Sequence, residues 1–268
     1  MELTQPIPFR EAIRRQAVRA VMPTSMGSDE LQRLNAAILR ASFFSARTLL
    51  EDYLHRAKQV IGELLEPRRV TRIDEQLGVE VTVTEGLNLA YARSELQALL
   101  DRLGYVPEED QAGTIQDLRS DARVNLVLRT NLQIAQGYGW WRQGMEPGVI
   151  EAFPAMEMVR VQGVKEPRNW RVRWDAAARA VRDWSAMRAA ADHGRLAARK
   201  DSPLWQALGD GAGGFESDAL HNPYPPFAFN SGMDVQDVTY QDAVAIGLIE
   251  PGQSVTPQLQ PFAENLAA

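Results

Sequence analysis

Apolar residues recur at helical spacing over a long stretch of this chain that contains no proline. The stretch runs from Leu31 to Leu65 and ends just before Pro67. Because a helix rises about 1.5 Å per residue, this periodicity predicts a helix on the order of 55 Å long. Such a helix exceeds what a compact domain requires, which favours a strut or an arm that faces another subunit. The sequence leaves open whether the helix is straight or broken near Ser42 to Ser45.

Two parts of the N-terminal region are candidates for contact with a partner. A short helix that begins near Phe9 and ends before Pro23 carries four arginines outside its apolar face: Arg10, Arg14, Arg15 and Arg19. They indicate either a solvated helix face or a surface for DNA or an acidic partner. Phe43 and Phe44 thicken the apolar stripe of the long helix, which indicates burial within the chain or packing on another subunit. The partner-binding candidates are therefore Arg10, Arg14, Phe43 and Phe44.

The composition removes several classes of site. The chain has 268 residues, which suits one large domain or two modest ones, and it has no cysteine. Disulfides, thiolate zinc sites and thiol nucleophiles are therefore excluded. The net charge of −6 gives no overall attraction to a polyanion, although local basic patches remain open. No run approaches the roughly 18–20 apolar residues of a membrane span, and residues 1–19 contain no apolar signal core. We expect a protein made in the cytoplasm, without a membrane partner.

The remaining segments alternate between strand and helix patterns. Residues 68–73 and 78–83 predict two strands joined by a hairpin turn, and Thr84 then caps a helix that ends at Gly104. A second helix, capped by Thr114, continues to Trp141 and contains Gly137 and Gly139. These glycines are tolerable if another segment packs closely against the helix backbone. Strands are predicted at 149–153 and 156–161, helical signals return at Asp175, and a short helix closes residues 237–249.

These patterns predict an α+β fold that is predominantly helical, with a long N-terminal helix and a small mixed sheet in the C-terminal domain. The expected organisation is a helical arm over residues 1–66, a strand-helix connection over 67–110, a compact domain over 111–250 and an extended tail over 251–268.

Searches for catalytic and metal-binding motifs give little. The three histidines, His55, His193 and His221, lack a second histidine at metal-ligand spacing. No zinc-protease helix, phosphate-binding loop or nucleophile elbow is present in the sequence. Asp192 beside His193 could orient a base, and Asp234 or Asp237 could bind a cation, but turn or cap roles fit these residues better. We predict no catalytic residue, no metal site and no cofactor.

The richest signal is an ordered set of motifs across the second half. An Arg-Thr pair on a helix is followed by two apolar strands, an arginine-rich segment at 168–174, a run at 194–205 and a proline-aromatic segment at 222–233. Over about residues 114–250 this set resembles the Mu F-like domain of phage head morphogenesis (minor head) proteins. The positions that match the family pattern are Arg129, Thr130, Arg171, Arg173, Asp201, Pro203, Trp205, Pro225 and Pro226.

The chain also departs from the family pattern. Family members often end the Pro-Pro loop with a cysteine element and often carry a histidine soon after the arginine-rich turn. Here Phe229–Met233 and Asp175–Ala178 stand at those places, so the metal or redox role tied to them has no residues to perform it. Read physically, the prolines stiffen the loop, the tryptophans provide large buried surfaces, and Arg171 and Arg173 can stack on rings or pair with carboxylates.

The resemblance implies a structural minor head protein of a tailed bacteriophage, present in few copies in the virion and associated with the portal vertex during capsid assembly. The implied partners are the portal protein, other capsid or scaffolding proteins and copies of the chain itself, and the implied protein is not an enzyme. Two alternatives stay open. One is an internal or ejected virion protein that contacts DNA, and the other is a phage-borne enzyme or toxin-related transferase.

Overall fold

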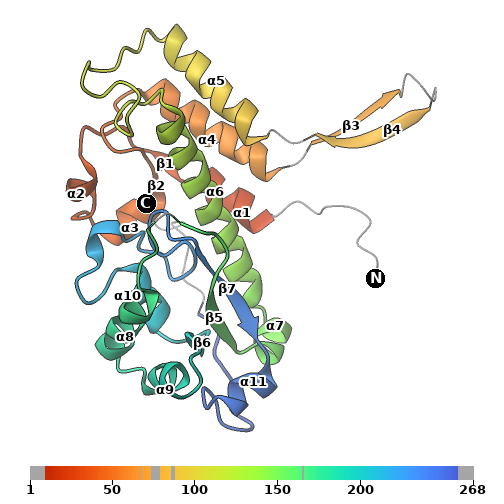
Figure 1. Ribbon diagram of the computed structural model, residues 1–268. Coiled ribbons are helices and arrows are strands. Elements are labelled where there is room, and N and C mark those ends of the chain that lie inside the picture. Colours follow the sequence, from red (N-terminus) through yellow and green to blue (C-terminus); the bar gives the residue numbers. More distant parts are fainter. Residues whose placement is uncertain (1–9, 67, 74–78, 86–87, 165, 259–268) are drawn as a thin grey trace, which may run out of the picture. The chain divides into compact units, whose positions relative to one another are not determined.

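The computed structural model describes residues 10–66, 68–73, 79–85, 88–164 and 166–258 (Figure 1). The chain forms two compact units. Of the described residues, unit 1 contains 10–27 and 42–136, and unit 2 contains 28–41 and those from 137 onward. Unit 2 therefore combines a short N-terminal segment with the C-terminal half of the chain, a division that differs from the predicted boundaries at 66 and 111.

Unit 1 is built mainly from helices around an aliphatic core. Its elements are α1 (Arg10–Val18), β1 (Ala20–Val21), β2 (Ser42–Phe43), α4 (Glu51–Leu65), β3 (Arg68–Ile73), β4 (Glu80–Glu85), α5 (Leu89–Arg102) and the first part of α6 (Asp121–Gly144). The fully buried core side chains include Leu54, Ile61, Leu96, Leu100 and Leu128. They come from α4, α5 and α6, whose apolar positions fall on one helical face as the sequence pattern requires.

The predicted long helix over residues 31–65 does not form. The stretch instead contains α2 (Ser28–Leu31), α3 (Ala36–Ala41), the short strand β2 and α4. The physical reason is a parallel pairing between β1 and β2, in which Ala20 lies opposite Ser42. Further backbone bonds follow, from Met22 to Phe43 and from Thr24 to Thr48, each 2.9 Å long. These bonds hold the backbone after α3 in an extended path, so the break lies near Ser42 to Ser45.

Unit 2 contains a three-stranded sheet and several short helices. Its elements are α2, α3, the last part of α6, α7 (Pro147–Ala152), β5 (Ala155–Arg160), α8 (Trp170–Val181), α9 (Trp184–Asp192), β6 (Ala197–Arg199), α10 (Leu204–Gly209), the 3-10 helix η1 (Glu216–Asp218), β7 (Met233–Val238) and α11 (Tyr240–Ala245). The strand order is β6-β5-β7, and both pairings are antiparallel. The predicted α+β, predominantly helical class is confirmed, although this sheet is antiparallel where a mixed one is predicted.

Several local predictions are confirmed. The strand pair β3–β4 forms, with Val70 opposite Val83, while the predicted turn at 74–78 lies outside the described residues. Gly104 follows α5 with a φ of 70°, the left-handed conformation expected at a helix C-terminus. Strand β5 lies within one residue of its predicted range. Residues 251–258 contain no helix or strand, and the rest of the predicted tail lies outside the described part of the chain.

Other local predictions are wrong for identifiable reasons. Residues 149–153 belong mostly to α7, which begins with Pro147, because proline is well suited to a first helical turn. Thr84 is a strand residue, and α5 is capped instead by Asn88, whose side chain accepts a hydrogen bond from the Tyr91 N–H at 2.8 Å. Thr114 lies in a turn several residues before α6. None of the described helices combines the length and apolar character needed to cross a membrane.

Candidate functional site

Three aromatic side chains from different segments meet in the interior of unit 2. The rings of Trp174 and Trp205 are arranged edge to face, with centroids 5.4 Å apart and planes at 74°. Phe227 stacks on Trp205, with centroids 5.9 Å apart and planes at 19°. All three side chains are buried, and the Trp205 indole N–H donates to the backbone oxygen of Arg199 at 2.8 Å. Trp205 therefore connects α10 to α8 and to the Pro-Pro loop.

The Pro-Pro loop packs closely against the last part of α6. The peptide bond between Pro225 and Pro226 is cis. Tyr224, which precedes it, is buried with its ring centroid 5.7 Å from that of Trp141 on α6. A Cβ atom added to Gly137 would come within 1.8 Å of the Pro225 carbonyl oxygen. Only glycine fits at this position, which confirms that a helical glycine is tolerated where another backbone approaches closely.

Arg173 is the most heavily engaged of the predicted motif residues. Its guanidinium donates to both carboxylate oxygens of Asp218, at 2.8 and 2.9 Å. It also lies 5.2 Å from the ring centroid of Trp170 and 4.7 Å from that of Phe215. A second arginine, Arg168, contacts the same carboxylate at 2.7 Å. Asp218 thus forms ion pairs with two arginines, a role that the sequence does not single out because Asp218 is 45 residues from Arg173.

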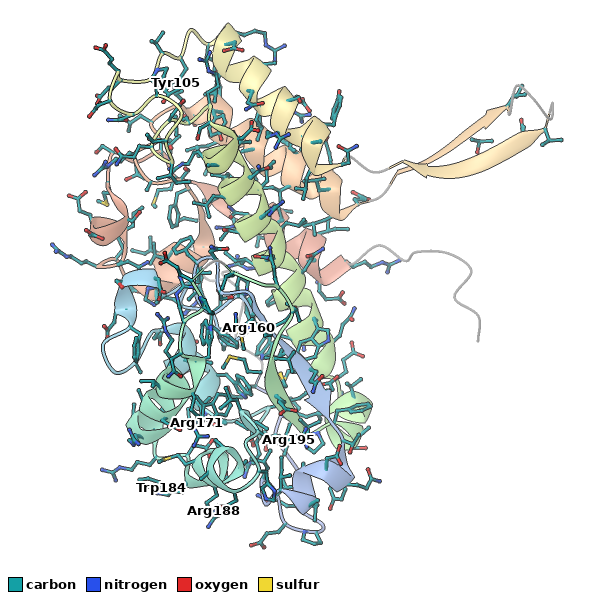
Figure 2. The ribbon with its side chains drawn as sticks, viewed as in Figure 1. Tyr105, Arg160, Arg171, Trp184, Arg188 and Arg195 are labelled. Carbon is teal, nitrogen blue, oxygen red and sulfur yellow. The ribbon has the colours of Figure 1, made fainter. Side chains whose placement is uncertain are left out.

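The other predicted arginine and aspartate make more local contacts. Arg171, on α8 (Figure 2), donates to Asp175 at 3.0 Å and to the backbone oxygen of Ala190 in α9 at 2.6 Å. Asp201 accepts two hydrogen bonds from Arg199, at 2.8 and 2.6 Å. These hydrogen bonds raise the pKa of Arg199. Pro203 stands at the N-terminal cap of α10. These residues position helices within unit 2.

Lys200 is a buried cation that the sequence does not single out. It is 1% exposed, and its Nζ lies 2.7 Å from the Asp237 carboxylate and 3.1 Å from the Gly144 carbonyl oxygen. Burial lowers the pKa of Lys200, while the hydrogen bond to Asp237 acts in the opposite direction. Asp237, expected to be a turn or cap residue, lies in β7 and makes an ion pair instead. Lys200, the residue after β6, therefore connects β7 through Asp237 to the end of α6 through Gly144.

His221 joins the N-terminal segment of unit 2 to its C-terminal half. Its Nδ1 lies 3.0 Å from an Asp210 carboxylate oxygen, and its Nε2 lies 3.2 Å from the Gln32 side-chain oxygen. The His221 backbone oxygen accepts a hydrogen bond from Arg40 at 3.0 Å. The Nε2 contact and the Arg40 bond therefore hold the segment that contains α2 and α3, while the Nδ1 contact fixes the ring on Asp210. In the described part of the chain, no group of three His, Asp or Glu side chains is arranged to hold a metal.

The structure divides the predicted motif set between the two units. Arg129 and Thr130 lie on the part of α6 that belongs to unit 1, where Arg129 is exposed and Thr130 is buried. The other motif residues all lie in unit 2. Among the latter, Trp205 and the Pro-Pro loop share one aromatic cluster through Phe227, whereas Arg171, Arg173 and Asp201 each bind a different carboxylate or guanidinium.

The predicted partner-binding residues are only partly at the surface. Arg10 and Arg14 are exposed on α1. Phe43 is fully buried in the core of unit 1. It therefore packs within the chain and is not available to another subunit. Phe44 is half-buried. Arg19 is also buried, where it donates to the backbone oxygen of Ser42 at 2.8 Å.

Burial of Arg15 and Arg19 reduces the basic surface that the four arginines near α1 could form.

Comparison of the chain with models of protein families, with curated proteins and with solved structures gave no match.

Proposed function

We propose that this chain is a structural minor head protein of a tailed bacteriophage, of the Mu F-like head morphogenesis type. It would be present in few copies in the virion, associated with the portal vertex, and take part in capsid assembly. The starting support is the ordered set of motifs over about residues 114–250, which resembles that family. The head protein would act by binding portal, capsid or scaffolding proteins.

The observation that carries the proposal is the way unit 2 uses its motif residues. Arg173 is held by a carboxylate and two aromatic rings, and Trp205 is enclosed by two further rings. Interlocked side chains of this kind resist rearrangement, since each has several partners in fixed geometry. A rigid module of this type suits a protein that docks into an assembly, and it leaves the work of recognition to exposed surfaces.

The exposed arginines of α1 provide one such surface. Arg10 and Arg14 lie one helical turn apart, and both are exposed. Two guanidinium groups on the same face favour an acidic partner surface, because charge complementarity sets both orientation and rate of association. We assign this face of α1, which belongs to unit 1, to contact with the portal or a neighbouring capsid protein.

Assembly of procapsids tests the proposal directly. The full chain is co-expressed with the portal, scaffolding and major capsid proteins of a tailed bacteriophage, and purified procapsids are examined by quantitative mass spectrometry. We expect the chain in a low, reproducible number of copies per particle. Procapsids and virions that contain none of it would overturn the head assignment.

A charge-reversal variant tests the α1 surface separately. The double substitution Arg10→Glu with Arg14→Glu should lower incorporation at least severalfold, because it places like charges against the partner. The control is Arg102→Glu, which changes an exposed arginine at the end of α5 in the same unit. Equal incorporation of both variants would remove α1 as the contact surface while leaving the head assignment intact.

A further inference from the structure

One segment of this acidic chain is strongly basic. Residues 160–200 contain eleven arginines and lysines and only four aspartates and glutamates, although the whole chain has a net charge of −6. The segment covers α8, α9 and β6, all in unit 2. A local excess of positive charge of this size attracts polyanions in spite of the overall charge.

Many of these cations are already neutralised inside unit 2. The ion pairs in this segment are Arg168 and Arg173 with Asp218, Arg171 with Asp175, Arg195 with Glu157, Arg199 with Asp201, and Lys200 with Asp237. Arg179, Arg182 and Arg188 differ from these. They are exposed, and within the described part of the chain no ion pair is found for them. Their charge is directed at solvent.

The turn between α8 and α9 brings these arginines to one corner of unit 2. Arg182 adopts a left-handed conformation with a φ of 59°, and the Asp183 N–H bonds back to the Ala178 oxygen at 2.9 Å. The Trp184 N–H bonds to the Arg182 oxygen at 3.1 Å. Arg179 lies in the last turn of α8 and Arg182 is its C-terminal cap residue, two positions before Trp184 at the start of α9.

Trp184 is unlike the other tryptophans of the chain. Its side chain is 57% exposed, whereas Trp174 and Trp205 are almost completely buried. Arg188 follows one helical turn later on the same face of α9. Figure 2 shows Trp184 and Arg188 both at the outer edge of α9, directed away from the ribbon. The corner therefore presents an exposed aromatic ring on a short stretch of chain that also carries three exposed arginines.

A surface hollow adjoins this corner. It has a volume of about 610 Å³ and is lined by Ser185 and Arg188 of α9, by Arg199, and by the loop Gly247–Gln253. The acidic side chain in its lining is Glu250. The hollow lies within unit 2 and continues the exposed face beyond Arg188.

We propose that this corner, formed by Arg179, Arg182, Trp184 and Arg188, binds a single-stranded segment of nucleic acid. The guanidinium groups bind phosphates, and the Trp184 ring stacks on an unpaired base. A ring flanked by arginines is the combination that single strands require, because every base has a face to stack and every linkage carries a charge. In a duplex the bases are already stacked on each other, so the exposed ring would have no comparable partner.

An acidic protein is the competing occupant, and the surroundings of Trp184 disfavour it. Tryptophan hot spots in protein interfaces lie in packed pockets ringed by side chains that exclude water. Trp184 instead stands at a turn between two helices, among charged side chains. The inference depends on none of the motif residues and does not rest on the proposed head function.

Binding is measured by fluorescence anisotropy of a labelled single-stranded oligonucleotide titrated with the full chain. Trp184→Ala should weaken binding by about fivefold to 150-fold, since stacking on an aromatic side chain contributes roughly 1–3 kcal/mol per base. Trp184→Phe keeps an aromatic face and should retain most of the affinity. Arg188→Gln should weaken binding and reduce the slope of log K against log salt concentration by about 0.7, as expected for one lost phosphate contact to a single strand.

Two control variants, and one variant that is expected to bind more tightly, complete the test. Val172→Ala removes another exposed apolar side chain of α8, and Arg102→Gln removes an exposed arginine of unit 1. Neither should change the affinity. Glu250→Gln should tighten binding severalfold, because it removes a negative charge from the hollow beside Arg188.

Three outcomes would overturn the inference. The first is an affinity that is unchanged by both Trp184→Ala and Arg188→Gln. The second is a duplex that binds as tightly as the single strand and is unaffected by Trp184→Ala. The third is polyglutamate that competes as well as an unlabelled oligonucleotide, which would identify an acidic protein as the occupant. Thermal unfolding of each variant should match that of the parent chain, since the substituted side chains are exposed.

Discussion

Arg123 of unit 1 and Arg195 of unit 2, both half-buried, are held by different kinds of acceptor. In unit 1, Arg123 donates to the Ser45 hydroxyl at 2.6 Å and to the backbone oxygen of Ala46 at 2.5 Å, and burial lowers its pKa. In unit 2, Arg195 donates to both oxygens of Glu157, and these hydrogen bonds raise its pKa. Figure 2 labels Arg195 in the lower part of the view. Arg123 is thus held by neutral acceptors and Arg195 by a carboxylate, although unit 1 also contains arginine–carboxylate pairs, such as Arg56 with Glu63 and Glu95.

The hydrophobic cores of the two units also differ in composition. The core of unit 1 consists mostly of leucine, valine, isoleucine and alanine, which pack without a strong directional preference. The core of unit 2 contains paired aromatic rings, and all six tryptophans of the chain lie in that unit. Aliphatic packing depends mainly on pattern and volume, whereas ring pairs and ion pairs depend on geometry. Unit 2 should therefore be the less tolerant of substitution.

The largest expected effect is the removal of the central ring of unit 2. Trp205→Ala should destabilise unit 2 by about 4 kcal/mol, because a large buried side chain is lost and a cavity remains. Thermal unfolding followed by tryptophan fluorescence reports unit 2 alone, and far-UV circular dichroism reports both units. We expect the fluorescence transition to shift to lower temperature and to separate from a second transition of unit 1. The control, Leu96→Ala, should shift the unit 1 transition instead. A single transition that moves equally in both variants would show that the units unfold together.

The next largest effect concerns the buried ion pair. Asp237→Ala leaves the Lys200 ammonium buried without a carboxylate, with the Gly144 carbonyl and the Trp140 ring, whose centroid is 5.9 Å from Nζ, as the remaining contacts, which should cost about 3 kcal/mol. The double variant Lys200→Met with Asp237→Ala removes both charges and should recover most of the loss. Urea unfolding followed by fluorescence measures both. Equal stability of the single and double variants would mean that charge burial does not set the cost.

Two glycine substitutions compare the units by backbone contact. Gly137→Ala should destabilise unit 2 by about 2 kcal/mol, since the new methyl group collides with the Pro225 carbonyl. Gly62→Ala, in α4 of unit 1, meets no atom within 4 Å and should stabilise unit 1 by roughly 0.5–1 kcal/mol. Differential scanning calorimetry measures whether each variant lowers or raises the unfolding temperature of its unit. A stabilising Gly137→Ala would contradict the close approach of the Pro-Pro loop.

An effect comparable in size to that of Gly137→Ala, but confined to alkaline pH, lies in unit 1. Burial raises the pKa of Tyr53 from 10.0 to about 12. The unfolded chain loses this proton at lower pH than the folded chain, so the stabilisation is complete below pH 10.0 and is lost as the pH rises towards about 12. The loss should approach about 2 kcal/mol. Tyr53→Phe should show a shallower decline of stability over this window, measured by urea unfolding and circular dichroism. An identical decline would assign the alkaline sensitivity to other groups.

Some of the fold follows from local sequence alone. The helical spacing of apolar residues in α4 and α5 is a local property, and it brings Ala57, Ile61 and Leu96 onto the buried faces of these helices. The alternating pattern of β3 and β4 and the conformation of Gly104 also depend on neighbouring residues only. The ends of α5 and α6 are less predictable, because Thr84 and Thr114 offer the same capping chemistry as Asn88.

The candidate site shows the opposite balance. The sequence indicates that Arg173 and Trp205 need partners. It does not indicate that these partners are Asp218 and Phe215 for Arg173, and Phe227 for Trp205. Lys200 gives no local signal of burial, since its partners Gly144 and Asp237 lie far from it in the chain. In the sequence, Trp184 is not distinguished from the buried tryptophans. In the structure it follows the turn at Arg182 and its side chain is exposed.

By itself, the sequence determined the fold class, the aliphatic helices of unit 1 and the absence of cysteine chemistry, since these depend on composition and on periods of a few residues. Only the tertiary structure decided that the stretch from 31 to 65 is broken, that residues 28–41 belong with the C-terminal half, and which carboxylate each arginine meets. The physical reason is that a strand pairing such as β1 with β2, or an ion pair across 45 residues, is favourable only once distant segments are brought together.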